Sequence, residues 1–183
     1  MIRRAWQHCG GTAMVEFGLT LPVLMVMFYG TIEVTRYILI TQKVEKMAHT
    51  VADVAAQSKT LTTVSLNQLM EATEEIMNPF STGANSRVLI SSQYRPAGST
   101  STATVNWRYQ GGGSLAATSA LGHVGTAPVM PGGFTFNERE NVIAAEVFYR
   151  FSPLLSNQFF GTTTVYRVAF YKPRFGRLTT APS

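Results

Sequence analysis

The feature that most constrains the fold is an apolar run near the N-terminus, residues 12–32, in which every side chain is uncharged except Glu16. As a helix this run would be about 31 Å long, close to the thickness of the hydrocarbon core of a bilayer. A carboxylate is costly at that depth, so Glu16 requires a specific reason to be there. We therefore expect a transmembrane helix, residues 12–32, that carries one functional acidic side chain.

Basic residues precede this run: residues 1–11 include Arg3 and Arg4 and no acidic residue. Because such residues are retained on the cytoplasmic side of a membrane, they predict a single-pass protein with a cytoplasmic N-terminus and an exported C-terminal domain. An ordinary signal anchor or a cleaved signal peptide would also begin this way. Against cleavage after the run, no small-x-small site closes it, and Thr31-Ile32-Glu33 continues into more helix.

The helix is predicted to continue as an amphipathic segment, residues 33–58, which gives a continuous helix of roughly 70 Å. Pro22 is the expected kink, and Gly10-Gly11 is the expected break before the helix, with Thr12 in its first turn. The apolar face repeats at three- and four-residue spacing and consists of Val34, Ile38, Thr41, Val44, Ala48, Val51 and Ala55. The opposite, solvent-facing side carries Arg36, Lys43, Lys46, Asp53 and Gln57.

The rest of the chain, residues 59–183, is predicted to form an exported α+β domain. A second, short helix is expected at Leu66–Met77, with Ser65 as its N-cap and Pro79 just beyond its end. Alternating patterns predict strands at 87–94, 102–109, 141–151 and 162–171, which would form a four-stranded antiparallel sheet packed on both helices. Residues 111–140 are expected to be a mobile loop, with a subunit or surface contact as the alternative. The basic tail, KPRFGR, is expected to be a solvated terminus; binding to an acidic partner or to the membrane surface is the alternative.

Enzymatic and metal chemistry are not indicated. The single cysteine, Cys9, excludes an internal disulfide, and the three histidines, His8, His49 and His123, lie far apart in the sequence. There is no metal-ligand spacing and no nucleophile elbow, so we expect no catalytic residue, no metal and no cofactor. The net charge of +5 comes from scattered Lys and Arg residues, which does not favour a nucleic-acid partner.

The N-terminal pattern resembles a known processing site. A short basic leader, residues 1–11, ends in Gly11, Glu16 stands at the fifth position after it, Phe17 follows, and Pro22 comes early in the apolar helix. This arrangement resembles type IV pilin-like proteins, and the sub-pattern GxxxVEF…LP…E resembles the TadE/TadF-like pseudopilins of the tight adherence (Tad, Flp pilus) machinery. Phe17 fits the minor pseudopilins better than the major pilins, which usually carry Tyr there. A weaker similarity in two later segments, VNWRY and AEVFYRFSP, favours a TadF-like member.

The resemblance implies cleavage between Gly11 and Thr12 by a prepilin peptidase on the cytoplasmic face. The new Thr12 amine would then lie one helical turn from Glu16, where an ammonium and a carboxylate attract strongly in a low dielectric. The pair could form within one chain or between adjoining subunits. The resemblance favours the second arrangement.

The implied function is that of a minor pseudopilin needed for assembly or initiation of a Flp-type pilus and for surface adherence. Its implied partners are the prepilin peptidase, other Tad pseudopilins, the Flp pilin, inner-membrane Tad assembly proteins and membrane lipid. Two alternatives remain: a membrane-anchored periplasmic scaffold that never enters the filament, and an adhesive tip protein whose aromatic sheet binds surfaces.

Overall fold

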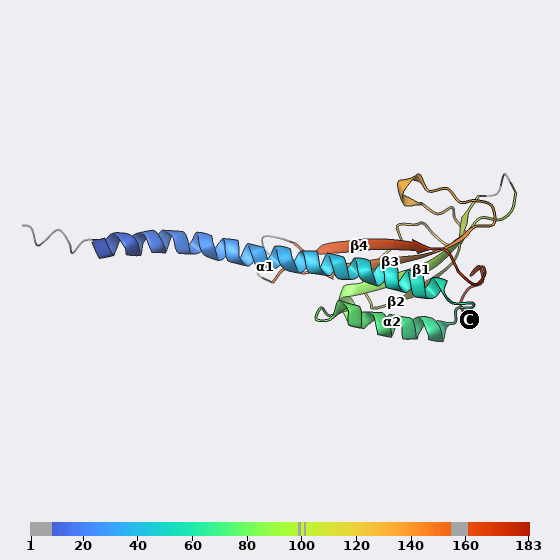
Figure 1. Ribbon diagram of the computed structural model, residues 1–183, viewed down its shortest axis with the longest axis horizontal. Coiled ribbons are helices and arrows are strands. Elements are labelled where there is room, and N and C mark those ends of the chain that lie inside the picture. The colour runs from blue at the N-terminus through green and yellow to red at the C-terminus, as the bar shows by residue number, and fades with distance from the viewer. Residues whose placement is uncertain (1–8, 99, 101, 155–160) are drawn as a thin grey trace, which may run out of the picture.

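The computed structural model describes residues 9–98, 100, 102–154 and 161–183. Its elements are two long helices, two short 3-10 helices and four strands. In chain order they are α1 (Cys9–Ala56), α2 (Thr63–Met77), η2 (Gly83–Asn85), β1 (Ser86–Tyr94), β2 (Thr104–Gly111), η3 (Pro131–Gly133), β3 (Asn141–Phe151) and β4 (Thr163–Tyr171). The N-terminal half of α1 projects away from a domain formed by everything else (Figure 1). The predicted α+β architecture is confirmed.

The helix α1 has 48 residues and is therefore about 72 Å long. It begins at Cys9, so Gly10 and Gly11 lie in its first turn, and the break expected before Thr12 is absent. Pro22 lies inside the helix, which continues on both sides of it.

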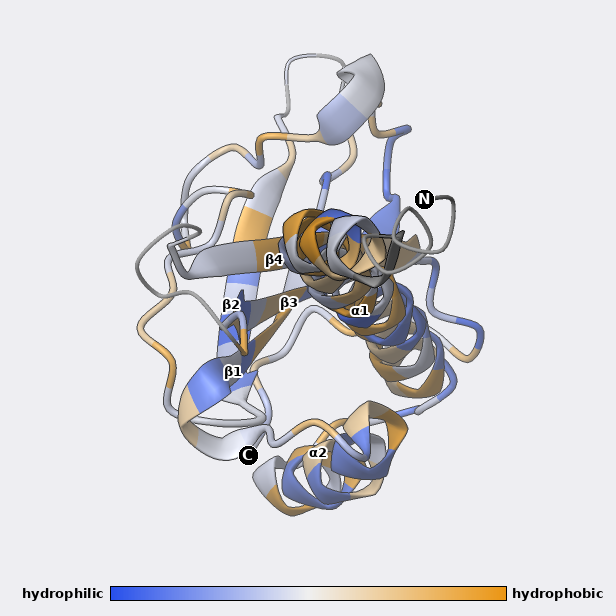
Figure 2. Ribbon diagram, turned by 90° about the vertical axis from the view of Figure 1, so that its left-hand side faces the viewer, coloured by the Kyte–Doolittle hydropathy of each residue, from blue (hydrophilic) through white to orange (hydrophobic). Residues whose placement is uncertain are grey.

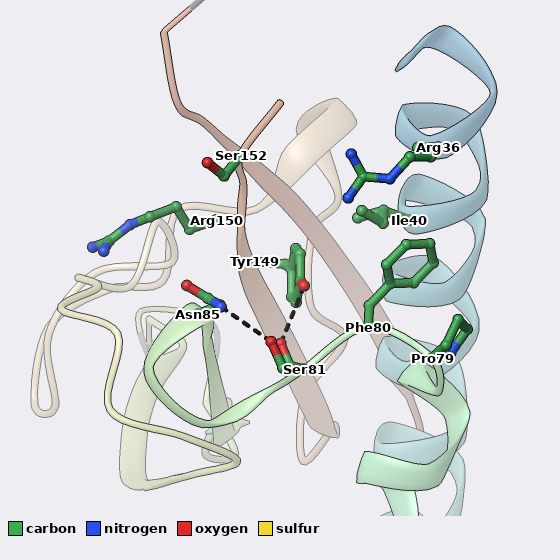
Figure 3. A pocket seen from close by; sticks show the side chains of 9 residues that line it. All are labelled: Arg36, Ile40, Pro79, Phe80, Ser81, Asn85, Tyr149, Arg150 and Ser152. Carbon is green, nitrogen blue, oxygen red and sulfur yellow. Dashed lines mark hydrogen bonds between the residues drawn. The ribbon is translucent and has the colours of Figure 1, made fainter. Parts of the chain in front are cut away.

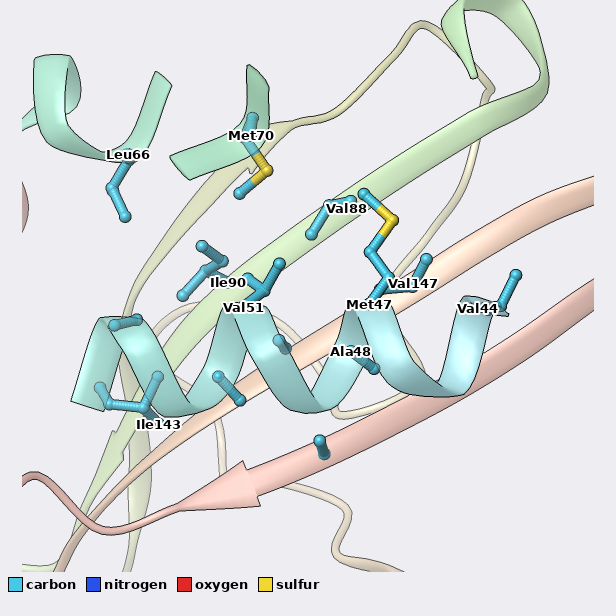
Figure 4. Packing of buried hydrophobic residues seen from close by; sticks show 14 of the residues in the cluster. Val44, Met47, Ala48, Val51, Leu66, Met70, Val88, Ile90, Ile143 and Val147 are labelled. Atoms are coloured by element: carbon cyan, nitrogen blue, oxygen red, sulfur yellow. The ribbon is translucent and has the colours of Figure 1, made fainter. Parts of the chain in front are cut away.

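The buried face of α1 begins at Ile40 and consists of Ile40, Val44, Met47, Ala48, Val51, Ala52, Ala55 and Ala56. These residues pack against one face of the sheet, where Val88, Ile90, Ile143 and Val147 meet them (Figure 4). Val34 and Ile38, which we expected on the same face, are 59% and 48% exposed. The prediction was wrong there because periodicity identifies a helix face and not how far along the helix its partner extends.

The second helix begins earlier than predicted. Thr62, and not Ser65, is the N-cap: the Thr62 hydroxyl accepts a hydrogen bond from the Ser65 N–H at 3.1 Å, and the Ser65 hydroxyl accepts one from the Thr62 N–H at 3.0 Å. This reciprocal pair is a capping box. The helix ends at Met77, as predicted, and buries Leu66, Met70 and Met77.

The sheet is antiparallel throughout, with the order β2-β1-β3-β4. The helices α1 and α2 lie on the same side of it (Figure 2). The inward face of β3 is the one that alternation predicts, with Ile143, Ala145, Val147, Tyr149 and Phe151 all in the core. Phe148 lies on the opposite face with Leu89 and Leu115.

The long connection after β2 is packed on the domain, where it buries Leu115, Leu121 and Phe136. The mobile loop predicted for residues 111–140 is therefore wrong. The basic segment KPRFGR is solvent-exposed, as predicted, apart from the half-buried Pro173. The chain is anchored directly after it: Leu178 is buried in the main core, and its carbonyl accepts a hydrogen bond from the Trp107 indole N–H at 2.8 Å.

Candidate functional site

The free part of α1 is the most unusual surface of the molecule. Within the described residues, α1 alone is long and apolar enough to cross a membrane, and its most apolar stretch has a mean hydropathy of 1.7 with none of its residues buried in the protein. Met14 and Val26 are 79% and 73% exposed. Soluble monomers rarely expose contiguous apolar patches of this size, so this surface is consistent with a single-pass membrane anchor.

The predicted processing and carboxylate residues lie together at the far end of this helix. Gly11, Thr12, Glu16 and Phe17 occupy its first turns, and all four are exposed. The Thr20 hydroxyl donates to the Glu16 backbone carbonyl at 2.9 Å, but within the described part of the chain no hydrogen bond or ion pair reaches the Glu16 carboxylate. Glu16 is about 36 Å along the helix from Ile40, the first buried residue of α1. A partner for this carboxylate must therefore come from the N-terminus itself or from another molecule.

The bond between Gly11 and Thr12 lies in the first helical turn. A Cβ added at Gly11 would meet no atom within 4 Å, so the structure leaves space around this bond. Two adjacent glycines weaken a helix by about 1 kcal/mol each relative to alanine, which lowers the cost of locally unwinding this turn. Arg3 and Arg4, predicted to set the orientation, lie outside the described residues.

The helix meets the domain directly after the predicted end of the span at Ile32. Glu33 forms an ion pair with Arg36, with Oε2 and Nη1 3.4 Å apart, and its other oxygen accepts a hydrogen bond from the Leu154 N–H. One turn on, the Tyr37 and Phe151 rings meet edge to face, with centroids 5.4 Å apart. These contacts fix the direction of the span relative to the domain.

A pocket of about 230 Å³ opens beside this junction, between α1, the α2–β1 connection and β3 (Figure 3). It is lined by Arg36, Ile40, Pro79, Phe80, Ser81, Asn85, Tyr149, Arg150 and Ser152. The Tyr149 hydroxyl donates to the Ser81 carbonyl at 3.1 Å. Burial raises the pKa of this hydroxyl, although the Arg36 charge opposes the shift, so Tyr149 is neutral at physiological pH. Sequence reasoning missed the pocket because its walls come from three distant segments.

A buried carboxylate, Glu146, holds the long connection to the outer face of the sheet. Its oxygens accept hydrogen bonds from the Ser119 hydroxyl, from the Ala120 N–H at 2.8 Å and from the Tyr166 hydroxyl at 3.0 Å. Arg108 donates to Ser119 at 2.8 Å and brings a compensating charge. Burial and the Glu146 charge both raise the pKa of Tyr166, which keeps its proton.

These groups form a structural network that holds the long connection to the sheet. Within the described ranges, no group of three or more His, Cys, Asp or Glu side chains could hold a metal ion.

Comparison with known proteins gives a match to the N-terminal helix. A family model described as TadE-like protein matches residues 11–53 of the 183-residue chain. The match begins at Gly11, includes Glu16 and Phe17, and ends within the part of α1 that packs on the sheet. No curated protein and no solved structure matches the chain. The similarity supports association with a Tad pilus system and covers the helix that carries the candidate site.

Proposed function

We propose that the chain is a TadE-like minor pseudopilin, of the TadF-like kind, which a prepilin peptidase cuts between Gly11 and Thr12 and which serves in assembly or initiation of a Flp-type pilus. One observation carries the proposal. Glu16 lies on an unpartnered apolar helix at the fifth position after Gly11, inside the segment that is similar to TadE-like proteins.

Cleavage would give Glu16 the partner that it lacks. Once residues 1–11 are removed, Thr12 carries an ammonium group one turn from the Glu16 carboxylate. In the hydrocarbon each charge alone is costly, whereas the pair is much less so. An amine donated by a neighbouring subunit would satisfy Glu16 and, at the same time, set the axial register between the two helices.

The remaining surfaces fit a subunit that lies in the inner membrane. Residues 12–32 would span the bilayer with the N-terminus in the cytoplasm, and the domain from Glu33 onward would lie in the periplasm, where it can contact other Tad pseudopilins, the Flp pilin and inner-membrane Tad assembly proteins. The rigid junction at Glu33, Arg36 and Tyr37 would transmit the position of the span to the domain.

An adhesive aromatic sheet is less well supported. Phe148, Tyr149 and Phe151 are buried in the two clusters of the domain and form no exposed aromatic face. Phe159 and Phe160 lie outside the described residues.

The test is the mature N-terminus of the protein in its native host, determined by mass spectrometry with and without the prepilin peptidase. The expected chain begins at Thr12 when the peptidase is present and retains residues 1–11 when it is absent. A chain that begins at Met1 in both strains would overturn the proposal. Mass spectrometry of sheared filaments then separates a pilus subunit from a scaffold that remains in the membrane.

A further inference from the structure

The end of the domain that faces the span carries a pocket lined by charged, polar and apolar residues. We call this end the membrane-proximal base and define it by Arg36, Leu154 and the pocket beside Arg36. Leu154 is 66% exposed. Arg36 projects from α1 one turn before Ile40 at the edge of the pocket, whereas the Arg150 side chain extends away from the pocket on the other side of β3 (Figure 3).

The base lies at the depth of lipid headgroups if residues 12–32 span the bilayer. Arg36 is four residues past Ile32, which places its Cα about 6 Å beyond the hydrocarbon. The headgroup layer extends about 5–7 Å on each side of the core. Leu154 is held at the same level, because its N–H donates to Glu33, the first residue after the span.

The lining of the pocket suits an anion. It offers the Arg36 guanidinium and hydroxyl and amide groups from Ser81, Asn85 and Ser152, and none of its lining residues is acidic. Ile40, Pro79 and Phe80 close the pocket on the side away from the span (Figure 3). Arg36 has five N–H donors, and its pairing with Glu33 at 3.4 Å occupies only one nitrogen. Donors therefore remain for a phosphate, for which guanidinium is a preferred partner.

We propose that this pocket binds the phosphate of an anionic phospholipid in the leaflet from which α1 emerges. Arg36 is the main ligand, and exposed Leu154 lies against the acyl region. The bound lipid would fix the height and tilt of the domain above the membrane. This inference rests on the membrane anchoring in the proposed function, and it is independent of peptidase cleavage and of pilus assembly.

The experiment uses the full, uncut chain in lipid nanodiscs and then in detergent, with native mass spectrometry as the readout. The probes are phosphatidylglycerol, which carries a net negative phosphate, and diacylglycerol, which carries no phosphate. We expect preferential retention of phosphatidylglycerol and about tenfold weaker retention in Arg36→Gln, the loss expected for one charge-assisted hydrogen bond. Arg150→Gln should retain the lipid nearly as the wild type does, because the Arg150 side chain extends away from the pocket.

Two control variants test whether the change in lipid retention is specific to the Arg36 charge. Lys59→Gln removes the same charge from the exposed segment after α1, at the other end of the domain, and should retain the lipid as the wild type does. Glu33→Gln removes the carboxylate that competes for Arg36 and should strengthen retention. Trp107 fluorescence, recorded with Trp6 replaced by phenylalanine in every variant so that it reports the buried core, checks that each variant is folded.

Equal retention of both lipids, or an equal loss in Arg36→Gln and Lys59→Gln, would overturn the lipid site. Displacement of phosphatidylglycerol by an equal concentration of inorganic phosphate would also overturn it, since the site would then serve a soluble anion. A chain that does not insert into nanodiscs would overturn both this inference and the membrane anchor. If the chain inserts normally but does not retain the lipid preferentially, only the lipid site is overturned. The proposed function is then still decided by the cleavage test.

Discussion

The ammonium of Lys43 on α1 donates to the carbonyl oxygen of Ile76 in the last turn of α2 at 2.9 Å. It also donates to the Asn78 carbonyl, again at 2.9 Å. The final carbonyls of a helix have no partner within that helix, and a cation at this end interacts favourably with the helix dipole. Lys43, which we had placed on the solvent face of α1, therefore joins the two helices.

Replacing Lys43 with methionine should lower the free energy of unfolding by about 1–3 kcal/mol, because two carbonyls lose a charged donor. The measurement is urea denaturation of the full chain in detergent, followed by Trp107 fluorescence with Trp6 replaced by phenylalanine throughout. Lys46→Met is the matched control: Lys46 lies on the same helix and is exposed, so its loss should change the free energy of unfolding by less than about 0.5 kcal/mol. Equal effects of the two variants would contradict the capping role.

Glu146→Ala should destabilise the domain by about 2 kcal/mol, because three part-buried donors lose their acceptor and Arg108 loses the carboxylate whose charge it compensates. Tyr166→Phe removes a single hydrogen bond and should cost about 1 kcal/mol. Hydrogen exchange should localise the effect of Glu146→Ala to residues 115–122, which the carboxylate holds to the sheet. Unchanged exchange in that segment would show that Leu115 and Leu121 suffice to hold it.

Gly113 joins β2 to the long connection in a conformation that only glycine adopts readily, with φ at +126°. A Cβ there would lie 2.3 Å from the carbonyl oxygens of Gly83 and Ser86, so Gly113→Ala should shift the backbone and lower the melting temperature by several degrees. Gly125→Ala is the control: its φ is +84°, but its Cβ would meet nothing within 4 Å. It should cost only the conformational strain of about 1 kcal/mol, measured by the same thermal scan. A Gly113→Ala variant as stable as Gly125→Ala would contradict the clash.

Local patterns predicted the elements of this fold well. Alternation in β3 identified the inward residues from Ile143 to Phe151, and Pro79 correctly marked the end of the second helix. Interactions between distant segments were missed. Two of the three donors to Glu146 come from a connection whose Gly- and Ser-rich composition indicates a loop. The acceptors of Lys43 are backbone carbonyls that carry no sequence signature.

The pattern of the candidate site, in contrast, depends on neighbouring residues and could be read from the sequence. The positions of Gly11, Glu16 and Phe17 are set by spacing along one helix, so the pattern does not depend on tertiary contacts. The helix start at Cys9 was missed because two adjacent glycines oppose helix formation on propensity alone. The pocket beside Arg36 was also missed, since Phe80 and Tyr149 reach it from separate elements.

Acid should weaken the link between the long connection and the tail. Burial tends to raise the pKa of Glu140, but the Lys172 ammonium and the Asn137 N–H outweigh it and hold the pKa below its ordinary value. A carboxyl group with a lowered pKa contributes stability above its unfolded pKa of about 4.3 and loses it as the pH falls further. The melting temperature of the wild type should therefore exceed that of Glu140→Gln at neutral pH, and the difference should shrink below about pH 4. Glu138→Gln, which changes an exposed neighbour, should show little difference at any pH; a constant difference for Glu140→Gln would contradict the ion pair.

Glu16 should matter for filament incorporation and not for membrane insertion. Removing its charge makes the span more apolar, so Glu16→Ala and Glu16→Gln should both fractionate with the inner membrane as the wild type does. Both should be depleted about tenfold or more in sheared filaments quantified by mass spectrometry, since the Thr12 amine of a cleaved subunit would then be buried without a carboxylate. Glu45→Ala is the control, because Glu45 is exposed beyond the span and lies 3.8 Å from Arg167. Because glutamine keeps the shape of glutamate without its charge, normal incorporation of Glu16→Gln would show that the charge of Glu16 is not what joins the subunits.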